Sequence, residues 1–124
     1  MKPRIDMELL HDHREGLIAL SGCVAGKIPQ YILSGSMEEA EKTALEFKEL
    51  FGDDFYLEIQ NHDLDEERKI AYGIRLISEK YSIPMVATND VHYLEKDDAY
   101  IQNVLMSVQM NVTVNSKSDK MFPT

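Results

Sequence analysis

The sequence has little cysteine, no long hydrophobic run and few basic residues, and each deficit excludes a class of protein. Cys23 is the one cysteine among 124 residues, so an internal disulfide is excluded, as expected in a reducing cytoplasm. No apolar stretch approaches the roughly 20 residues that a membrane helix needs, and the chain does not open with the basic and apolar regions of a secretory signal. We therefore expect a cytoplasmic protein that does not enter the membrane.

Basic residues are outnumbered, since 13 Lys and Arg stand against 22 Asp and Glu, which gives a formal net charge of −9. A surface that binds nucleic acid neutralises phosphates with Lys and Arg, so the chain by itself is a poor candidate for a DNA-binding module. The sequence also lacks a glycine-rich phosphate loop, a Ser-His-Asp order and the cysteine spacing of a zinc ribbon. The acidic balance suits either a solvated surface or a site that collects cations.

Three short apolar runs alternate with stretches that have a helical period. The runs are GLIALSG at 16–22, FYLEIQN at 55–61 and IPMVATND at 83–90, and each ends in small or polar residues as strands do. Units of about 30 to 40 residues are the size of parallel β-α-β crossovers, so the order predicts an α/β fold with parallel strands. Because the first and third runs are almost continuously apolar, we expect strands buried on both faces. Three strands leave two open sheet edges, which indicates that 1–124 is part of one larger domain.

Local signals predict where the helices begin and end. Helices are expected over 6–13, 25–35, 36–52, 63–81 and about 97–110. Ser36 is expected to begin the third of these as its N-cap, and Gly52 to end it. Either Asp63 or Asp65 is expected to cap the fourth. Pro29 must lie in a first turn or at a kink, so the second helix is expected to be broken.

The carboxyl ends of the predicted strands are where sites form in parallel α/β folds, because successive loops converge there. The polar residues that follow the three strands are Ser21, Gly22 and Cys23, then Gln60, Asn61 and His62, and finally Asn89, Asp90 and His92. If 90–92 continue the extended strand, the Asp90 carboxylate and the His92 imidazole point to one face and both reach one cation. Zn, Mn and Fe accept this mixture of nitrogen and oxygen ligands.

Each candidate also has a purely structural interpretation. Asp90 and His92 suit a capped turn or a surface histidine, and His62 suits a loop residue before a helix. Cys23 suits a small buried hydrophobe as well as a metal ligand. A solvated face at a positive helix N-terminus explains the acidic residues around the start of the fourth helix, which are Asp63, Asp65, Glu66 and Glu67.

The HDH motif at 11–13 imitates the His-x-His spacing of metal-binding pairs. It follows MELL on a predicted helix, where positions two apart do not share a face. We therefore expect His11 and His13 to be surface residues that bind no metal.

The strand-end motifs together resemble the polymerase and histidinol phosphatase (PHP) domain of bacterial DNA polymerase III alpha subunits. The resemblance extends over about 2–124 and is carried, in order and spacing, by EGLIALSGCVAGKIPQYILSG, FGDDFYLEIQNH and IPMVATNDVHYLEKDDAYIQNVLMSVQ. It implies a distorted, TIM-like β/α barrel with metal ligands at the carboxyl ends of the strands. His62 matches a ligand histidine, and Asp90 and His92 match a closing Asp-x-His pair. Cys23 matches a position that can also take part.

The family's opening His-x-His pair has no counterpart here, so the resemblance implies the later half of the domain. It implies a fragment of the replicative alpha subunit, a DNA-directed DNA polymerase, which contributes ligands for divalent Zn, Mn or Fe to a phosphoesterase or 3′–5′ exonuclease site. The alternatives are a metal-independent scaffold that binds the proofreading exonuclease subunit, or a segment of a free-standing PHP phosphoesterase. The implied partners are the rest of the alpha subunit and this exonuclease, with DNA bound only through the parent protein. The fragment alone is expected to be inactive.

Overall fold

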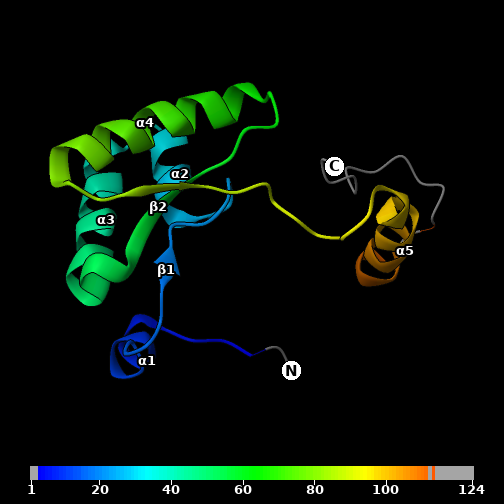
Figure 1. The fold of residues 1–124 in the computed structure, drawn as a ribbon, viewed down its shortest axis with the longest axis horizontal. Coiled ribbons are helices and arrows are strands. Elements are labelled where there is room, and N and C mark those ends of the chain that lie inside the picture. Colours follow the sequence, from blue (N-terminus) through cyan, green and yellow to red (C-terminus); the bar gives the residue numbers. More distant parts are fainter. Residues whose placement is uncertain (1–2, 112, 114–124) are drawn as a thin grey trace. The chain divides into compact units, whose positions relative to one another are not determined.

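The computed structural model describes residues 3–111 and 113, and the chain divides into two compact units, Met1–Ala87 and Thr88–Thr124. The first unit contains, in chain order, α1 Met7–Asp12, β1 Ala19–Leu20, α2 Lys27–Leu33, α3 Met37–Phe51, the 3-10 turn η1 Gly52–Asp54, β2 Phe55–Ile59, α4 Asp65–Tyr81 and β3 Met85–Ala87 (Figure 1). The second contains the 3-10 turn η2 Lys96–Asp98 and α5 Ala99–Met110. No helix within the described residues is long and apolar enough to cross a membrane.

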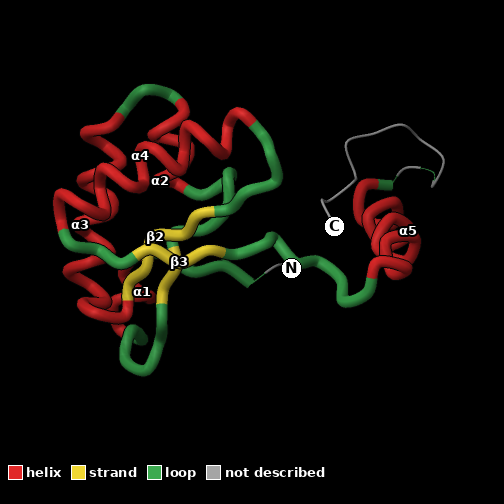
Figure 2. Tube along the Cα trace, turned by 45° about the horizontal axis from the view of Figure 1, so that its top comes forward, coloured by secondary structure: helices red, strands yellow, loops and turns green. Residues whose placement is uncertain are grey.

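The strands of the first unit form a parallel sheet in the order β1-β2-β3 (Figure 2). Ala19 of β1 pairs with Phe55, and Met85 of β3 pairs with Leu57. The predicted α/β class with parallel strands is therefore confirmed. Because the three strands run in one direction, their carboxyl ends lie at the same edge of the sheet, which is where the candidate residues were expected.

The edge strands are more exposed than their apolar sequences predict. Phe55 and Leu57 of the central strand are 1% and 0% exposed, whereas Leu20 of β1 and Met85 of β3 are 47% and 41% exposed. The expectation that the first and third strands are buried on both faces is therefore wrong. Each edge strand has a neighbouring strand on one side only, so part of its surface lacks cover.

Most helix ends follow the local signals in the sequence. α3 begins after its N-cap Ser36 and ends at Gly52, whose φ of +58° is the left-handed conformation that favours glycine. Pro29 lies in the first turn of α2, so this helix is continuous and not broken. The Asp6 carboxylate caps α1 by accepting a hydrogen bond from the backbone N–H of Leu9 at 2.8 Å. η2 and α5 together occupy the range predicted for the final helix.

The start of α4 differs from the prediction. Its N-cap is Leu64, which makes no side-chain capping hydrogen bond, so the capping role expected of Asp63 or Asp65 is wrong. Both carboxylates instead pair with the Arg68 guanidinium, at 3.3 Å and 3.1 Å respectively. An arginine one turn into the helix therefore competes with the helix N-terminus for these carboxylates.

The core of the first unit is formed by β2 and the helices that pack on it. Its buried hydrophobic residues are Ile28, Ala40, Ala44, Phe55, Leu57, Ile70, Ile74, Ile77 and Ile83. α4 contributes three isoleucines at three- and four-residue steps, and burial of each side chain stabilises the fold by about 1.5 to 3 kcal/mol. α4 also approaches α2 closely, since a Cβ at Gly73 would lie 2.7 Å from Cγ2 of Ile32. This packing holds α4 against the central strand, whose carboxyl end carries His62.

Candidate metal centre

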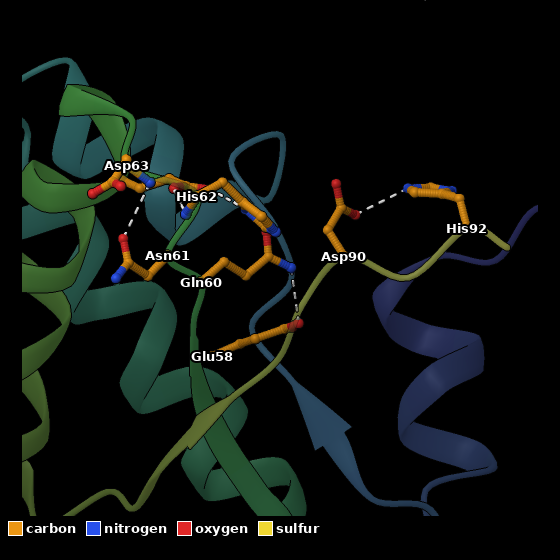
Figure 3. Close-up of polar contacts among 8 residues, drawn as sticks. Glu58, Gln60, Asn61, His62, Asp63, Asp90 and His92 are labelled. Carbon is orange, nitrogen blue, oxygen red and sulfur yellow. Dashed lines mark hydrogen bonds and ion pairs between the residues drawn. The ribbon is translucent and has the colours of Figure 1, made fainter. Parts of the chain in front are cut away.

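His62 lies in the loop between β2 and α4, where Glu67 contacts both its ring and its backbone. Its imidazole Nδ1 lies 2.7 Å from Oε1 of Glu67, and its backbone N–H donates to Oε2 of the same carboxylate at 2.5 Å. Figure 3 shows His62 beside Gln60, Asn61 and Asp63 at the end of this strand. A short loop and the first turn of α4 therefore fix both the backbone and the ring of His62.

Glu67 is buried, with 5% of its surface exposed, although it belongs to an acidic cluster. Burial raises the pKa of the Glu67 carboxyl, but hydrogen bonds from the His62 side chain and backbone, the attraction of that imidazole and the backbone N–H of Leu64 together outweigh burial, so the pKa lies below its usual value. The carboxylate form is therefore the one that this loop stabilises.

The burial of Glu67 corrects one expectation about the acidic residues at the start of α4. Asp63, Asp65 and Glu66 are exposed, as a solvated face requires, but Glu67 is not. The sequence carried a signal for this difference, because Glu67 precedes Ile70 by three residues and so shares the buried face of α4. Acidic composition alone therefore did not reveal that the Glu67 carboxylate is buried beside His62.

The loop after β1 is fixed against β2 by Glu58, a second carboxylate that the sequence reasoning missed. Glu58 Oε2 accepts a hydrogen bond from the backbone N–H of Gly22 at 3.0 Å, and the backbone N–H of Glu58 donates to Ser21 Oγ at 2.8 Å. The Gln60 amide also donates to Glu58 Oε1, at 3.4 Å (Figure 3). A charged residue within an otherwise apolar strand was the available signal.

A small cleft separates these loops and contains the candidate cysteine. It has a volume of about 10 Å³, room for roughly one water molecule, and is lined by Gly22, Cys23, Val24, Glu58, Gln60, Glu67 and Ile70. The Cys23 thiol is exposed, so its interpretation as a small buried hydrophobe is wrong. The structure thus brings Cys23 and Glu67 to one cleft at the carboxyl ends of β1 and β2.

Asp90 and His92, in the second unit, form a pair of their own. Asp90 Oδ1 lies 3.0 Å from His92 Nε2, and the two side chains point toward each other (Figure 3). The expectation that 90–92 continue the extended strand is wrong, because β3 ends at Ala87 and Asp90 has a φ of +52°. Aspartate tolerates this left-handed backbone conformation better than most residues. Irregular backbone with a positive φ at Asp90, and not an extended strand, therefore brings the carboxylate to the imidazole.

The HDH motif behaves as expected. His11, in α1, and His13, its C-cap, are both exposed. His11 Nδ1 lies 3.6 Å from Oδ1 of the equally exposed Asp12, a distance typical of a weak surface pair. The prediction that these histidines are surface residues is confirmed.

The donor atoms of the His62–Glu67 pair and of the Asp90–His92 pair suit a divalent cation by type. Imidazole nitrogen and carboxylate oxygen are ligands that Zn, Mn and Fe accept. Within residues 3–111 and 113, however, no group of three or more His, Cys, Asp and Glu side chains is arranged to hold a metal ion. Ligation by His62, Asp90, His92 and Cys23 therefore stays a prediction.

Comparison with known protein families identifies a matching family for the first half of the chain. Residues 1–62 match a family described as PHP domain. PHP domains are TIM-like barrels that generally bind divalent metals, and the parallel three-stranded sheet agrees with part of such a barrel.

Curated relatives match over more of the chain. It is 45% identical over 122 residues to the DNA polymerase III subunit alpha of Thermus aquaticus, which covers 98% of this chain and 10% of the relative. The corresponding protein of Treponema pallidum is 46% identical over 108 residues, with coverages of 86% and 9%. That of Aquifex aeolicus is 40% identical over 121 residues, with coverages of 98% and 10%. The chain thus spans about a tenth of the length of these relatives.

Proposed function

The chain belongs to the PHP domain family, and we propose that it is the later portion of a PHP domain in the alpha subunit of a bacterial replicative DNA polymerase. The observation that carries this proposal is the similarity to polymerase alpha subunits over 98% of the chain, which favours this parent over a free-standing phosphoesterase. DNA-directed DNA synthesis would belong to the parent subunit. The chain alone would be inactive as a polymerase.

In the intact domain, His62, Asp90 and His92 act as metal ligands, and Cys23 is a further candidate. Their support is the chemistry of the donor atoms and the location of His62 at the carboxyl end of a parallel strand. A divalent cation, whether Zn, Mn or Fe, supplies the Lewis acidity that phosphoester hydrolysis of the 3′–5′ exonuclease type requires. The remaining ligands would come from parts of the domain outside this chain.

The partners in this proposal follow from the parent protein. They are the rest of the alpha subunit and the separate proofreading exonuclease, and DNA is bound only through the parent. The net charge of −9 supports the last point, because an acidic chain is poorly suited to neutralising phosphates. A bacterial replicative subunit works in the cytoplasm.

The experiment is a metal analysis of the intact subunit that contains this chain. Elemental analysis after gel filtration would compare the wild type with the variants Asp90→Asn and His92→Ala. We expect both to lose bound divalent metal, because each removes one donor from the set. His11→Ala is the matched control, since this exposed histidine lies outside the proposed ligands, and it should keep its metal. Unchanged metal content in Asp90→Asn and His92→Ala would reject the ligand assignment.

A second candidate function is a metal-independent scaffold for the proofreading exonuclease. The observation that favours it is the exposed apolar surface of α5, where Tyr100, Ile101, Leu105 and Val108 are 68%, 57%, 60% and 77% exposed. Ile101→Glu with Leu105→Glu in the intact subunit should then weaken binding of the exonuclease subunit in a calorimetric titration. Retained binding by this double variant would reject the α5 surface as the contact.

A further inference from the structure

We propose that Glu67 is a positioning residue that fixes the proton of the His62 imidazole on Nδ1, so that Nε2 is the nitrogen presented to a divalent cation. This inference rests on the proposed role of His62 as a metal ligand. In this role Glu67 does not bind the metal itself. Its carboxylate orients the histidine that does.

The two hydrogen bonds between these residues determine the tautomer. Glu67 Oε2 accepts from the backbone N–H of His62 at 2.5 Å, and Oε1 lies 2.7 Å from the ring Nδ1. An ionised carboxylate only accepts hydrogen bonds, so Nδ1 must carry the proton and the lone pair of a neutral ring is on Nε2. A histidine ligates a metal through such a lone pair.

Burial of the two side chains and the packing of α4 keep the hydrogen bonds between His62 and Glu67 in place. The side chains of His62 and Glu67 are 13% and 5% exposed, so water competes weakly for the bond between them. Glu67 lies in the first turn of α4, and the same face of that helix buries Ile70 and Ile74 in the core. The carboxylate is therefore fixed on a packed element, while His62 lies in a loop that depends on it.

Two substitutions of Glu67 separate tautomer control from simple packing. In Glu67→Gln, the backbone N–H of His62 always donates, so it orients the amide oxygen toward itself and the amide NH₂ toward Nδ1. Nδ1 must then accept, which moves the ring proton to Nε2, where it opposes metal binding. Glu67→Ala removes the partner of Nδ1 and lets a metal select the tautomer.

The two roles therefore predict opposite orders of metal affinity. If Glu67 fixes the tautomer, Glu67→Gln binds metal more weakly than Glu67→Ala, although glutamine keeps the shape of the side chain. If Glu67 only packs the loop, alanine is the more damaging change, because it removes both hydrogen bonds and leaves a space. The stability of the metal-free protein should follow the packing order in either case.

The test is the Zn²⁺ affinity of the intact subunit, measured by competition with a chromophoric chelator. We expect Glu67→Gln to lose affinity by about 10- to 100-fold, the usual cost of losing an outer-shell partner, and Glu67→Ala to lose less. The control Glu66→Gln removes an exposed carboxylate from the same turn of α4 and should change affinity by less than about 2-fold. In thermal unfolding of the metal-free proteins, Glu67→Gln should have a higher Tm than Glu67→Ala.

The variant His62→Ala separates the two proposals. If it leaves Zn²⁺ affinity unchanged, His62 is not a ligand, and the assigned role of His62 and the inference about Glu67 are both rejected. If His62→Ala weakens binding but Glu67→Gln does not, or if Glu67→Ala is weaker than Glu67→Gln, the inference about Glu67 alone is overturned. Weakening by His62→Ala together with a lower affinity for Glu67→Gln than for Glu67→Ala supports both.

Discussion

The imidazole of His62 and the buried carboxylate of Glu67 are joined by a 2.7 Å hydrogen bond between Nδ1 and Oε1. Together with the bond from the His62 backbone, it lowers the pKa of Glu67 in the folded chain despite the opposing effect of burial. A carboxyl group whose folded pKa is depressed contributes stability above its unfolded pKa of about 4.3, and this contribution is lost as the pH falls through the folded pKa.

Glu67→Gln should therefore flatten the acid limb of the stability curve. In urea unfolding of the metal-free chain between about pH 6 and pH 3, the wild type should lose stability more steeply than Glu67→Gln, because only the wild type has this carboxylate to protonate. Glu66→Gln, which changes an exposed neighbour, should follow the wild type. Parallel acid limbs for the wild type and Glu67→Gln would show that the carboxylate is not stabilised by folding.

Gly73→Ala should destabilise the first unit. A Cβ at this position would lie 2.7 Å from Cγ2 of Ile32, closer than side chains pack. Overpacking costs about 1 to 3 kcal/mol, and the higher helix propensity of alanine returns up to about 1 kcal/mol, so we expect a net loss of about 1 kcal/mol in the free energy of unfolding. Ile32→Ala should cost less in the Gly73→Ala background than alone. Additive effects in this double-mutant cycle would contradict the close contact between α2 and α4.

Arg68→Ala should have little effect on stability, although Arg68 pairs with two carboxylates. The side chains of Arg68, Asp63 and Asp65 are 63%, 89% and 91% exposed, so water and salt screen both pairs. We expect a change within about 0.5 kcal/mol in the free energy of unfolding at 0.15 M salt. A loss of about 2 kcal/mol would mean that the two pairs hold the start of α4.

Cys23 should react quickly with a thiol reagent, since its side chain is exposed at the rim of the cleft. If Cys23 is a ligand, bound Zn²⁺ engages the thiolate and slows alkylation. Mass spectrometry of the intact subunit, treated with iodoacetamide with and without added Zn²⁺, reports this residue directly. Equal alkylation rates in both conditions would remove Cys23 from the ligand set and leave His62, Asp90 and His92 in it.

The parts of the fold that depend on local sequence were predictable. α3 followed from its apolar period and from Gly52, because helix ends of this kind are set within one turn. The N-cap of α4 was not predictable in the same way, since Arg68 offers Asp63 and Asp65 another partner. Exposure of the edge strands depends on neighbours that the local sequence does not specify.

The sequence pointed to candidate ligands at the strand ends, but it revealed neither their geometry nor the carboxylates of Glu58 and Glu67 that hold the loops around them. Asp90 and His92 were expected on one face of an extended strand, but they bond to each other in irregular backbone where Asp90 has a positive φ that no glycine marked. Glu67 was grouped with its exposed neighbours because acidic composition outweighed the helical period that it shares with Ile70. A charged residue that lies on the apolar face of a helix is the sequence signal for a buried polar residue.

The most direct test of the account is the location of the metal in the intact subunit. Crystals containing Zn²⁺, measured at the zinc absorption edge, would show each ion as an anomalous scattering peak. We predict peaks about 2.0 to 2.1 Å from Nε2 of His62 and within about 2.2 Å of the Asp90 carboxylate and the His92 imidazole. Peaks that lie away from all three residues, or a zinc ion bound to Nδ1 of His62, would contradict the account.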